Sequence, residues 1–509
     1  MQVEVLRHPT QRRRAPPKAP TGALLWFLRC TALVVFVLCL WLAVAVAWNF
    51  SNAATTRHSA VIAFFDPHVR DPVVWPEHLF IEEGEGGQEQ QRQQQQQQQH
   101  DHRHKHAAGD GLYSHLSLLQ YDFGRWRHPV RDVTFLEDEA QRWTSVVQRF
   151  FTQKKWNSFT LTSTRFFVVV HLVQLNYLDD VVLTVIERPT GRRWTYHGHS
   201  MLGMGLRMAP SSIDGCTEWT ASVLHRIPLE HEEAAEDLSI CYDRVDGVWR
   251  GSVSLLAEAM HNAGGNVPIS LVFTVQMTDA LAMLFPLDGT LKRPAYIHKA
   301  AGAEFVGKLI VGDEEHDLDG LAALDWTKID ALRETTWKRA SFSAQGQLTT
   351  IVRRRRGNSG DPNATTAVAE PQEKDDEVVS ESTAPARIGI NLSADVLDYR
   401  GHSLENAIWI NGTLFPLSGV SFVVPKYHKH RNTWHVRSLN PTTETVRLVF
   451  QPRSFREDKT DVAALLLTDS IQVYGLANIT VEFRPEPDLL YKLQIDNAVG
   501  LMEDHRAIW

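Results

Sequence analysis

An uncharged, apolar run near the N-terminus restricts how this chain can be placed in a cell. Residues 30–48 read CTALVVFVLCLWLAVAVAW, and these nineteen residues carry no charged side chain. As an α-helix they would cross the ~30 Å hydrocarbon core of a bilayer. Residues 1–29 hold several arginines and one acid, Glu4, so we expect a cytosolic tail, a signal-anchor and a lumenal or extracellular body. Cleavage as a signal peptide is the alternative, because AVAVA offers small residues.

Two weaker features agree with a body outside the cytosol. Five triplets are acceptor sequences for N-glycosylation; one, at Asn49, adjoins the apolar run, and the other four begin at Asn363, Asn391, Asn411 and Asn478. Outside the apolar run the chain has two cysteines, Cys216 and Cys241, which can form one disulfide or remain two buried thiols. No spacing of cysteine or histidine is typical of a zinc site, so the sequence predicts no metal and no cofactor.

Two segments of biased composition divide the rest of the chain. Residues 49–110 form a stalk and a spacer with a glutamine tract, which ends in alternating histidines at positions 100, 102, 104 and 106. Such a composition buries little apolar surface, so we expect disorder, with metal binding by the histidines as the alternative. A second polar segment, 353–385, is expected to be a disordered insertion.

The remaining chain is predicted to be all-β. Runs rich in valine, phenylalanine and threonine alternate with turns, and AIWINGTLFPL is typical of a hairpin with a type I′ turn at Asn411-Gly412. Many short strands favour barrels or sandwiches, and the turn cluster LFPLDGTLKRP divides them, so we expect two consecutive β halves, 111–290 and 291–509. The formal net charge of −8 leaves no basic surplus for binding nucleic acid.

Several separate motifs follow one another in an order that resembles a known family. They are GRWRHP (124–129), KKWNSFTLTSTRFFVVVHLVQLNYLDDVVLTVIERPTGR, AYIHKAAGAEFVGKLIVGDEEHDLDGLAALDWT (295–327), SLENAIWINGTLFPLSGVSF (403–422) and GLMEDHRAIW (500–509). In this order they resemble the domain of unknown function 2804 family over residues 124–509. Relative to that family, 353–385 is an insertion, and TKID stands where the family carries a glycine after its Leu-Asp-Trp motif.

The resemblance implies an architecture rather than a reaction. The family has no established activity to carry over to this chain. Its architecture is similar to that of calycin-like double-barrel proteins, which include carotenoid hydratases and lipid-responsive survival factors. For this chain, the resemblance therefore implies two calycin-like β halves, while function has to be argued from the site itself.

The motif ALDWT singles out Asp325 and Trp326 as a candidate site. Neighbours in a strand face opposite sides, so we expect one of them inside a barrel and the other outside. An acid in an apolar cavity has a raised pKa and can donate a proton to an alkene or a lipid-like substrate. The alternative is that Asp325 pairs with Arg339 across a strand and serves structure alone.

Other polar and aromatic residues extend this candidate site. The candidate acid–base groups are Asp325, His298, Glu405 and His505. The candidate ligand contacts are Trp326, Trp337, Trp409 and Arg339. Convergence of the acid–base groups on one cavity would indicate catalysis, and packing in the core is the alternative for the tryptophans.

Three functions are compatible with these features. The first, which we favour, is a membrane-tethered β-barrel body that binds a lipophilic small molecule. The second is a hydratase or isomerase acting on an isoprenoid or lipid, which requires an acid in the same cavity. The third is a glycan- or protein-interaction module that uses exposed tryptophans. The expected partners are the bilayer, through residues 30–48, and a lipophilic ligand, whereas the oligomeric state and the organelle stay open.

Overall fold

The described part of the chain is all-β, as predicted. The computed structural model describes residues 124–130, 133, 149–221, 237–260, 265–286, 294–354, 377–396, 398–399, 402–442, 444–462 and 466–508. The apolar run at 30–48, the spacer within 49–110 and the sequon at Asn363 lie outside these residues. Within the described ranges, no helix has the length and apolar character needed to span a membrane.

The first of two large sheets contains the strands from β1 to β13. They are β1 Gly124–Trp126, β2 Gln153–Ser163, β3 Phe166–Gln174, β4 Leu178–Glu187, β5 Arg193–Met201, β6 Leu206–Arg207, β7 Cys216–Thr220, β8 Asp237–Asp243, β9 Val248–Ala259, β10 Asn266–Gln276, β11 Leu281–Pro286, β12 Pro294–Val311 and β13 Glu314–Asp330. The pairings between these strands in the described residues are antiparallel, which fits short connections between sequential strands.

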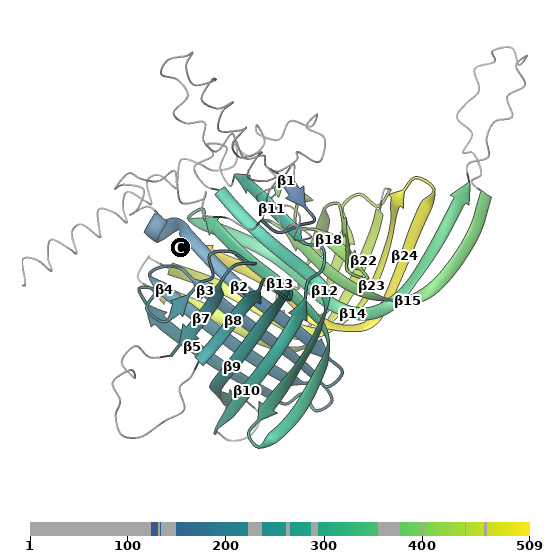
Figure 1. Cartoon of the computed structure of the whole chain (residues 1–509). Helices are drawn as coiled ribbons and strands as arrows, with labels where there is room; N and C mark the ends of the chain where they lie inside the picture. Colours follow the sequence, from purple (N-terminus) through teal and green to yellow (C-terminus); the bar gives the residue numbers. More distant parts are fainter. Residues whose placement is uncertain are drawn as a thin grey trace, which may run out of the picture. The chain divides into compact units, whose positions relative to one another are not determined.

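Eight strands of the first sheet close into a ring. β12 pairs with β13, β13 with β2, and the ladder continues through β3 and β4 to β5. β5 pairs with the end of β9, β9 pairs with β10, and β10 returns to β12. The hydrogen-bonded ladder therefore returns to the strand from which it starts, so the ring itself is closed (Figure 1, blue to teal). We refer to these eight strands as the strand ring.

Apolar side chains fill the inner face of the strand ring. Alternate residues of β4, including Val181 and Leu183, are fully buried, and they share one cluster with Phe159, Trp249 and Phe273. The rings of Phe159 and Phe273 lie 5.7 Å apart. Because side chains alternate across a strand, the residues between these positions face the outside of the ring.

The second sheet contains nine strands from the last third of the chain. They are β14 Glu334–Arg354, β15 Glu377–Ala394, β18 Ala407–Ile410, β19 Thr413–Pro416, β20 Val420–Val423, β21 Trp434–Ser438, β22 Glu444–Val462, β23 Leu466–Glu486 and β24 Leu489–Ile508. Their order is β19-β18-β15-β14-β24-β23-β22-β21-β20 (Figure 1, green to yellow). A separate pair, β16 Asp398–Tyr399 and β17 His402–Ser403, lies between β15 and β18 in the sequence.

Two predicted boundaries differ from the structure. The division at residue 290 falls between β11 and β12, which pair with each other in the first sheet, so the chain passes between the sheets at residues 331–333 instead. The expected disordered insertion 353–385 is too long, because β14 continues to Arg354 and β15 begins at Glu377. Hydrogen bonding between these two strands extends their regular structure into a segment of polar composition.

The two sheets meet backbone to backbone at a pair of glycines. Gly302 lies at a bulge in β12 with φ +70°, and a Cβ there would be 2.8 Å from the backbone nitrogen of Gly389 in β15. A Cβ on Gly389 would in turn overlap the carbonyl group of Ala301. The hydroxyl of Ser343 accepts a hydrogen bond from the Gly302 backbone N–H at 3.0 Å and donates to the carbonyl of Ala322 at 3.2 Å. The contact therefore requires glycine on both strands.

The structure also places the predicted disulfide and sequons. Cys216 and Cys241 form a disulfide between directly paired positions of β7 and β8. Asn391 is 2% exposed, and its Nδ2 group donates a hydrogen bond to the Glu405 carbonyl at 2.8 Å. The prediction that Asn391 is glycosylated is therefore wrong for the folded protein. Asn411 and Asn478 are exposed, and their glycosylation stays a prediction.

Candidate functional site

Three polar side chains lie next to one another inside the strand ring. Asn157 of β2, Trp326 of β13 and His298 of β12 occupy directly paired positions, so they project from the same face of the sheet. They are 4%, 1% and 0% exposed. Each has one polar atom without a hydrogen-bond partner among the described residues: Asn157 Oδ1, Trp326 Nε1 and His298 Nε2. We name these three residues the interior polar row.

Neighbouring residues hold the other polar atoms of the row. Asn157 donates its Nδ2 to the Thr217 hydroxyl at 3.2 Å, and His298 Nδ1 lies 2.7 Å from the Ser212 hydroxyl. Burial lowers the pKa of His298 to about 3, so its imidazole is neutral. An unsatisfied buried polar atom costs about 1–3 kcal/mol, so the three polar atoms of the row retain hydrogen-bonding capacity that a polar group could satisfy.

A buried carboxylic acid faces the same interior. Asp179 of β4 is fully buried and lies on the strand face of Val181, which belongs to the interior cluster. Its Oδ2 accepts hydrogen bonds from the Ser200 hydroxyl at 2.5 Å and the Leu206 N–H at 3.2 Å, whereas Oδ1 has no partner within the described ranges. Burial raises the pKa of Asp179, although these hydrogen bonds oppose the rise. Asp179 is thus an interior acid of the kind predicted at Asp325.

Asp325 itself faces away from the interior, toward the second sheet. Its Oδ2 lies 3.3 Å from Lys299 Nζ and forms an ion pair with Arg339 Nη1, and its Oδ1 accepts from the Thr327 hydroxyl at 2.9 Å. Burial alone would raise the pKa of Asp325, but the charges of Arg339 and Lys299 hold it at about 2. The carboxyl group is therefore ionised. The prediction that Asp325 donates a proton is therefore wrong. The alternative prediction, in which Asp325 pairs with Arg339, agrees with the observed ion pair.

Lys299 links this aspartate to Glu405. The Lys299 Nζ atom lies 3.1 Å from Glu405 Oε2, and the same oxygen accepts a hydrogen bond from the Ser393 hydroxyl at 2.8 Å. Lys299 and Glu405 are each 4% exposed. We name Lys299, Asp325, Arg339 and Glu405 the buried ion network. Each of its charges faces an opposite charge, so the network joins the sheets without leaving a reactive group.

His505, Trp337 and Trp156 form an aromatic stack that reaches from the second sheet to the first. His505 and Trp337 are directly paired on β24 and β14, and their rings lie 3.6 Å apart at an angle of 10°. Trp156 of β2 stacks on Trp337 at 6.2 Å. His505 Nδ1 lies 3.5 Å from Glu503 Oε1. Burial would raise the pKa of Glu503, but hydrogen bonding to His505 and the charges of His505 and Arg339 hold it at about 2.

The four predicted acid–base groups do not converge on one cavity. His298 faces the interior of the strand ring, while Asp325 and Glu405 share Lys299 between the sheets. His505 belongs to the stacked aromatic contact. Neighbouring positions on a strand face opposite sides, which separates His298 from Lys299 although the two are adjacent in sequence.

The predicted tryptophans are mostly core residues. Trp409 is fully buried and donates its Nε1 to the Asp279 carbonyl at 2.7 Å. Trp337 is half-buried in its stack, and Trp326 is buried in the interior polar row. None of the three forms the exposed stacking surface that a glycan-binding module needs.

Two interior residues were missed by the sequence prediction. Asp179 lies in the apolar run LDDVVLTVIE, two residues before Val181. Residues two apart in a strand share a face, so this spacing could have placed Asp179 inside the ring. Asn157 carries no such signal, because its position beside Trp326 depends on the pairing of β2 with β13. That pairing joins residues far apart in the sequence, which local patterns do not reveal.

Comparison with known proteins gives one family and a set of distant folds. The family described as Domain of unknown function (DUF2804) matches residues 121–353 and 378–509. Kievitone hydratase from Nectria haematococca is 11% identical over 69% of this chain and 88% of its own, with a TM-score of 0.35. A protein described as AttH from Nitrosomonas europaea is 10% identical over 74% of this chain and 98% of its own, with a TM-score of 0.37. No curated protein matches the sequence.

Proposed function

This chain belongs to the DUF2804 family, and on the geometry of its interior we propose that it binds a lipophilic small molecule inside the strand ring. The interior polar row carries this proposal. Three polar atoms without a partner in the described part of the chain stand among apolar side chains, and a bound polar group would satisfy them. We also propose that the two β halves are calycin-like, and the closed strand ring supports this for the first half.

The chemistry of the row favours a neutral ligand. Trp326 Nε1 can only donate a hydrogen bond, Asn157 Oδ1 can only accept one, and His298 is neutral. No charged side chain belongs to the row, so it offers no counter-ion for a carboxylate or phosphate. An apolar skeleton with a single hydroxyl or carbonyl group fits this set of atoms.

The membrane placement is part of the proposal. Residues 30–48 would hold the body at a bilayer, with residues 1–29 in the cytosol. The disulfide between Cys216 and Cys241 supports an oxidising compartment for the body. A lipophilic ligand dissolved in that bilayer would then be close to the strand ring.

Binding of farnesol and farnesene to the purified full chain tests this function. The two probes share an isoprenoid skeleton, and only farnesol has a hydroxyl group. We expect farnesol to bind about tenfold more tightly in a tryptophan-fluorescence titration, which corresponds to one net hydrogen bond. The substitutions Asn157→Leu and His298→Leu should each reduce this preference.

Trp434→Phe is the matched control, because Trp434 is buried in the second sheet. It should leave the preference for farnesol unchanged. Equal binding of both probes by the parent chain, or the same preference in both leucine variants, would contradict the role of the polar row. Absence of binding to either probe and to co-purifying lipids in native mass spectrometry would contradict a lipophilic ligand.

A second candidate function is a hydratase or isomerase that uses Asp179 as its acid. The observation that favours it is a fully buried carboxyl group inside the strand ring, a position in which burial raises the pKa of the acid. Asn157 of β2 and Asp179 of β4 face the same interior. Strand β3 lies between them, and Asp179 is two residues along β4 from the position level with Asn157, so their backbones are about 12 Å apart. An isoprenoid skeleton can span that distance between a polar anchor and a proton donor.

Incorporation of ¹⁸O from labelled water into farnesol, followed by mass spectrometry, tests this second candidate. If the parent chain hydrates an alkene, Asp179→Asn should reduce the rate about 100-fold or more, because the amide cannot supply the proton. Asp317→Asn, at an exposed position of β13, should leave the rate unchanged. Equal rates in both variants would exclude Asp179 as the acid.

A further inference from the structure

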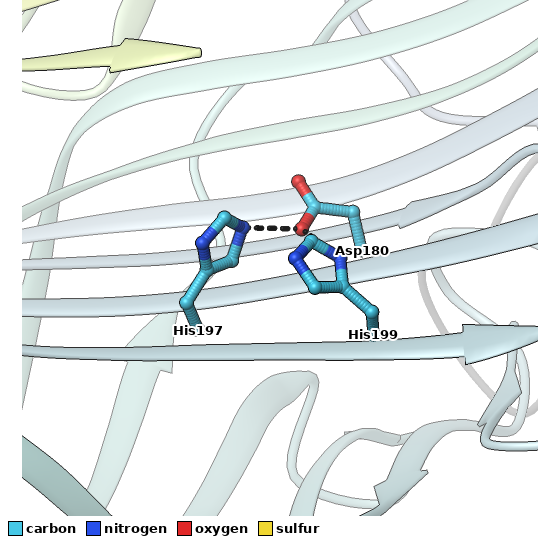
Figure 2. Close-up of side chains that lie close together, drawn as sticks. All are labelled: Asp180, His197 and His199. Carbon is cyan, nitrogen blue, oxygen red and sulfur yellow. Dashed lines mark hydrogen bonds and ion pairs between the residues drawn. The ribbon is translucent and has the colours of Figure 1, made fainter. Parts of the chain in front are cut away.

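Two histidines and an aspartate gather on the outer face of the strand ring. His197 and His199 lie two residues apart on β5, so both side chains project from one face, and Asp180 of β4 is directly paired with His199. Asp180 Oδ1 lies 2.7 Å from His197 Nε2 and 3.2 Å from His199 Nδ1. Figure 2 shows both imidazole rings turned toward the Asp180 carboxylate. Asp179 points to the other side of the sheet, so this cluster is separate from the interior.

We propose that Asp180, His197 and His199 bind a divalent transition-metal ion of the zinc class. Imidazole nitrogen and carboxylate oxygen are ligands that this class accepts. The three ligating atoms lie within 4.8 Å of one another. Zinc bonds of about 2.0–2.2 Å require tetrahedral ligand atoms about 3.4 Å apart, so small rotations of the two rings are sufficient.

The charges around the cluster favour a cation. Arg456 of β22 lies 3.4 Å from Asp180 Oδ2 through its Nη2 atom and also pairs with Asp458. Two carboxylates and one guanidinium leave one negative charge at the site.

Arg456 also orients the metal-binding oxygen. It contacts Oδ2 of Asp180, which leaves Oδ1 directed toward the histidines. Second-sphere hydrogen bonds of this kind commonly fix a carboxylate that binds a metal. The histidine side chains are 40% and 53% exposed, so an ion held by these three ligands keeps positions open to water. Three protein ligands with an open position are typical of a reactive zinc centre rather than a closed structural one.

Cobalt binding to the full chain tests this site. All samples carry alanine at positions 100, 102, 104 and 106, so that the histidine tract does not compete for the metal. After treatment with a chelator, the parent is titrated with Co²⁺, and its visible absorption reports the coordination of the ion. We expect one equivalent to bind, and Zn²⁺ to displace it. The double substitution His197→Ala/His199→Ala should weaken binding about 100-fold or more.

The matched control is His428→Ala/His430→Ala, a second pair of histidines two residues apart, whose rings lie 6.3 Å from each other. It should leave the affinity unchanged. A parent that binds no Co²⁺ or Zn²⁺, or a His197→Ala/His199→Ala chain that binds both as tightly as the parent, overturns the proposal.

A readout without substitutions keeps the proposal testable if that double variant does not fold. Zn²⁺ should slow the modification of His197 and His199 by diethyl pyrocarbonate, as mapped by peptide mass spectrometry, while His428 continues to react. Equal modification rates with and without Zn²⁺ also overturn the proposal.

Discussion

The substitution Lys299→Met is expected to lower the free energy of unfolding by about 3–5 kcal/mol, the effect of removing one partner from a buried ion pair. Lys299 is the cation that Asp325 and Glu405 share, at 3.3 Å and 3.1 Å from its Nζ atom. Without it, Glu405 keeps a hydroxyl contact with Ser393, and Asp325 keeps Arg339. Methionine has a similar length but leaves the two carboxylates less compensated. Urea denaturation of the full chain, followed by tryptophan fluorescence, measures the change.

Lys308→Met is the matched control for this prediction. Lys308 lies on the same strand, β12, and pairs with Glu315 of β13, but the side chains of this pair are 46% and 56% exposed. Exposed pairs contribute about 0–1 kcal/mol, so this substitution should change stability little. Similar decreases in the free energy of unfolding for Lys299→Met and Lys308→Met would contradict the prediction that the buried ion pairs contribute more to stability than the exposed pair.

Gly389→Ala is expected to destabilise the protein by about 3 kcal/mol or more, because backbone atoms have nowhere to move. The added methyl group would overlap the Ala301 carbonyl, where β15 meets β12. Either the two sheets separate there or the bulge at Gly302 is rearranged, and the hydrogen bond from Gly302 to Ser343 is disturbed in both cases. Differential scanning calorimetry of the full chain measures the loss.

Gly265→Ala is the control, because a Cβ at Gly265 meets nothing within 4 Å. We expect its effect to stay below about 0.5 kcal/mol. A Gly389→Ala chain with the stability of the parent would show that the contact between the sheets tolerates a wider spacing than the glycine pair indicates.

Local patterns predicted the strand content and one turn in detail. The Asn411-Gly412 hairpin joins β18 to β19, and both turn residues have positive φ values, 52° and 90°. The same kind of signal failed for the boundary between the halves. The strands before and after residue 290, β11 and β12, pair with each other in the first sheet, whereas residues 331–333 carry the chain to the other sheet without glycine or proline. A turn shows where a strand ends, not which sheet the next strand joins.

The candidate site was less predictable because both faces of β13 are covered. Residues 321–329 of this strand are buried without alternation, since the ring interior lies on one side and the second sheet on the other. The sequence therefore placed Asp325 and Trp326 on opposite faces of the strand but did not show which of them faced the ring interior. The ion partners of Asp325 depend on the register of β12 with β13, and the metal-site proposal depends on the register of β4 with β5. These registers are set when the strands pair in the folded sheet, so local sequence patterns do not reveal them.

The closure of the strand ring has a consequence for synthesis of the chain. β2 pairs with β13, and 150 residues separate Ser163 from Glu314. At about 5–20 residues per second, a ribosome needs on the order of ten seconds to make them. During that interval β2 presents an unpaired edge, which can join a neighbouring nascent chain on the same polysome. We therefore expect the emerging first sheet to depend on chaperones until its closing strand has been translated.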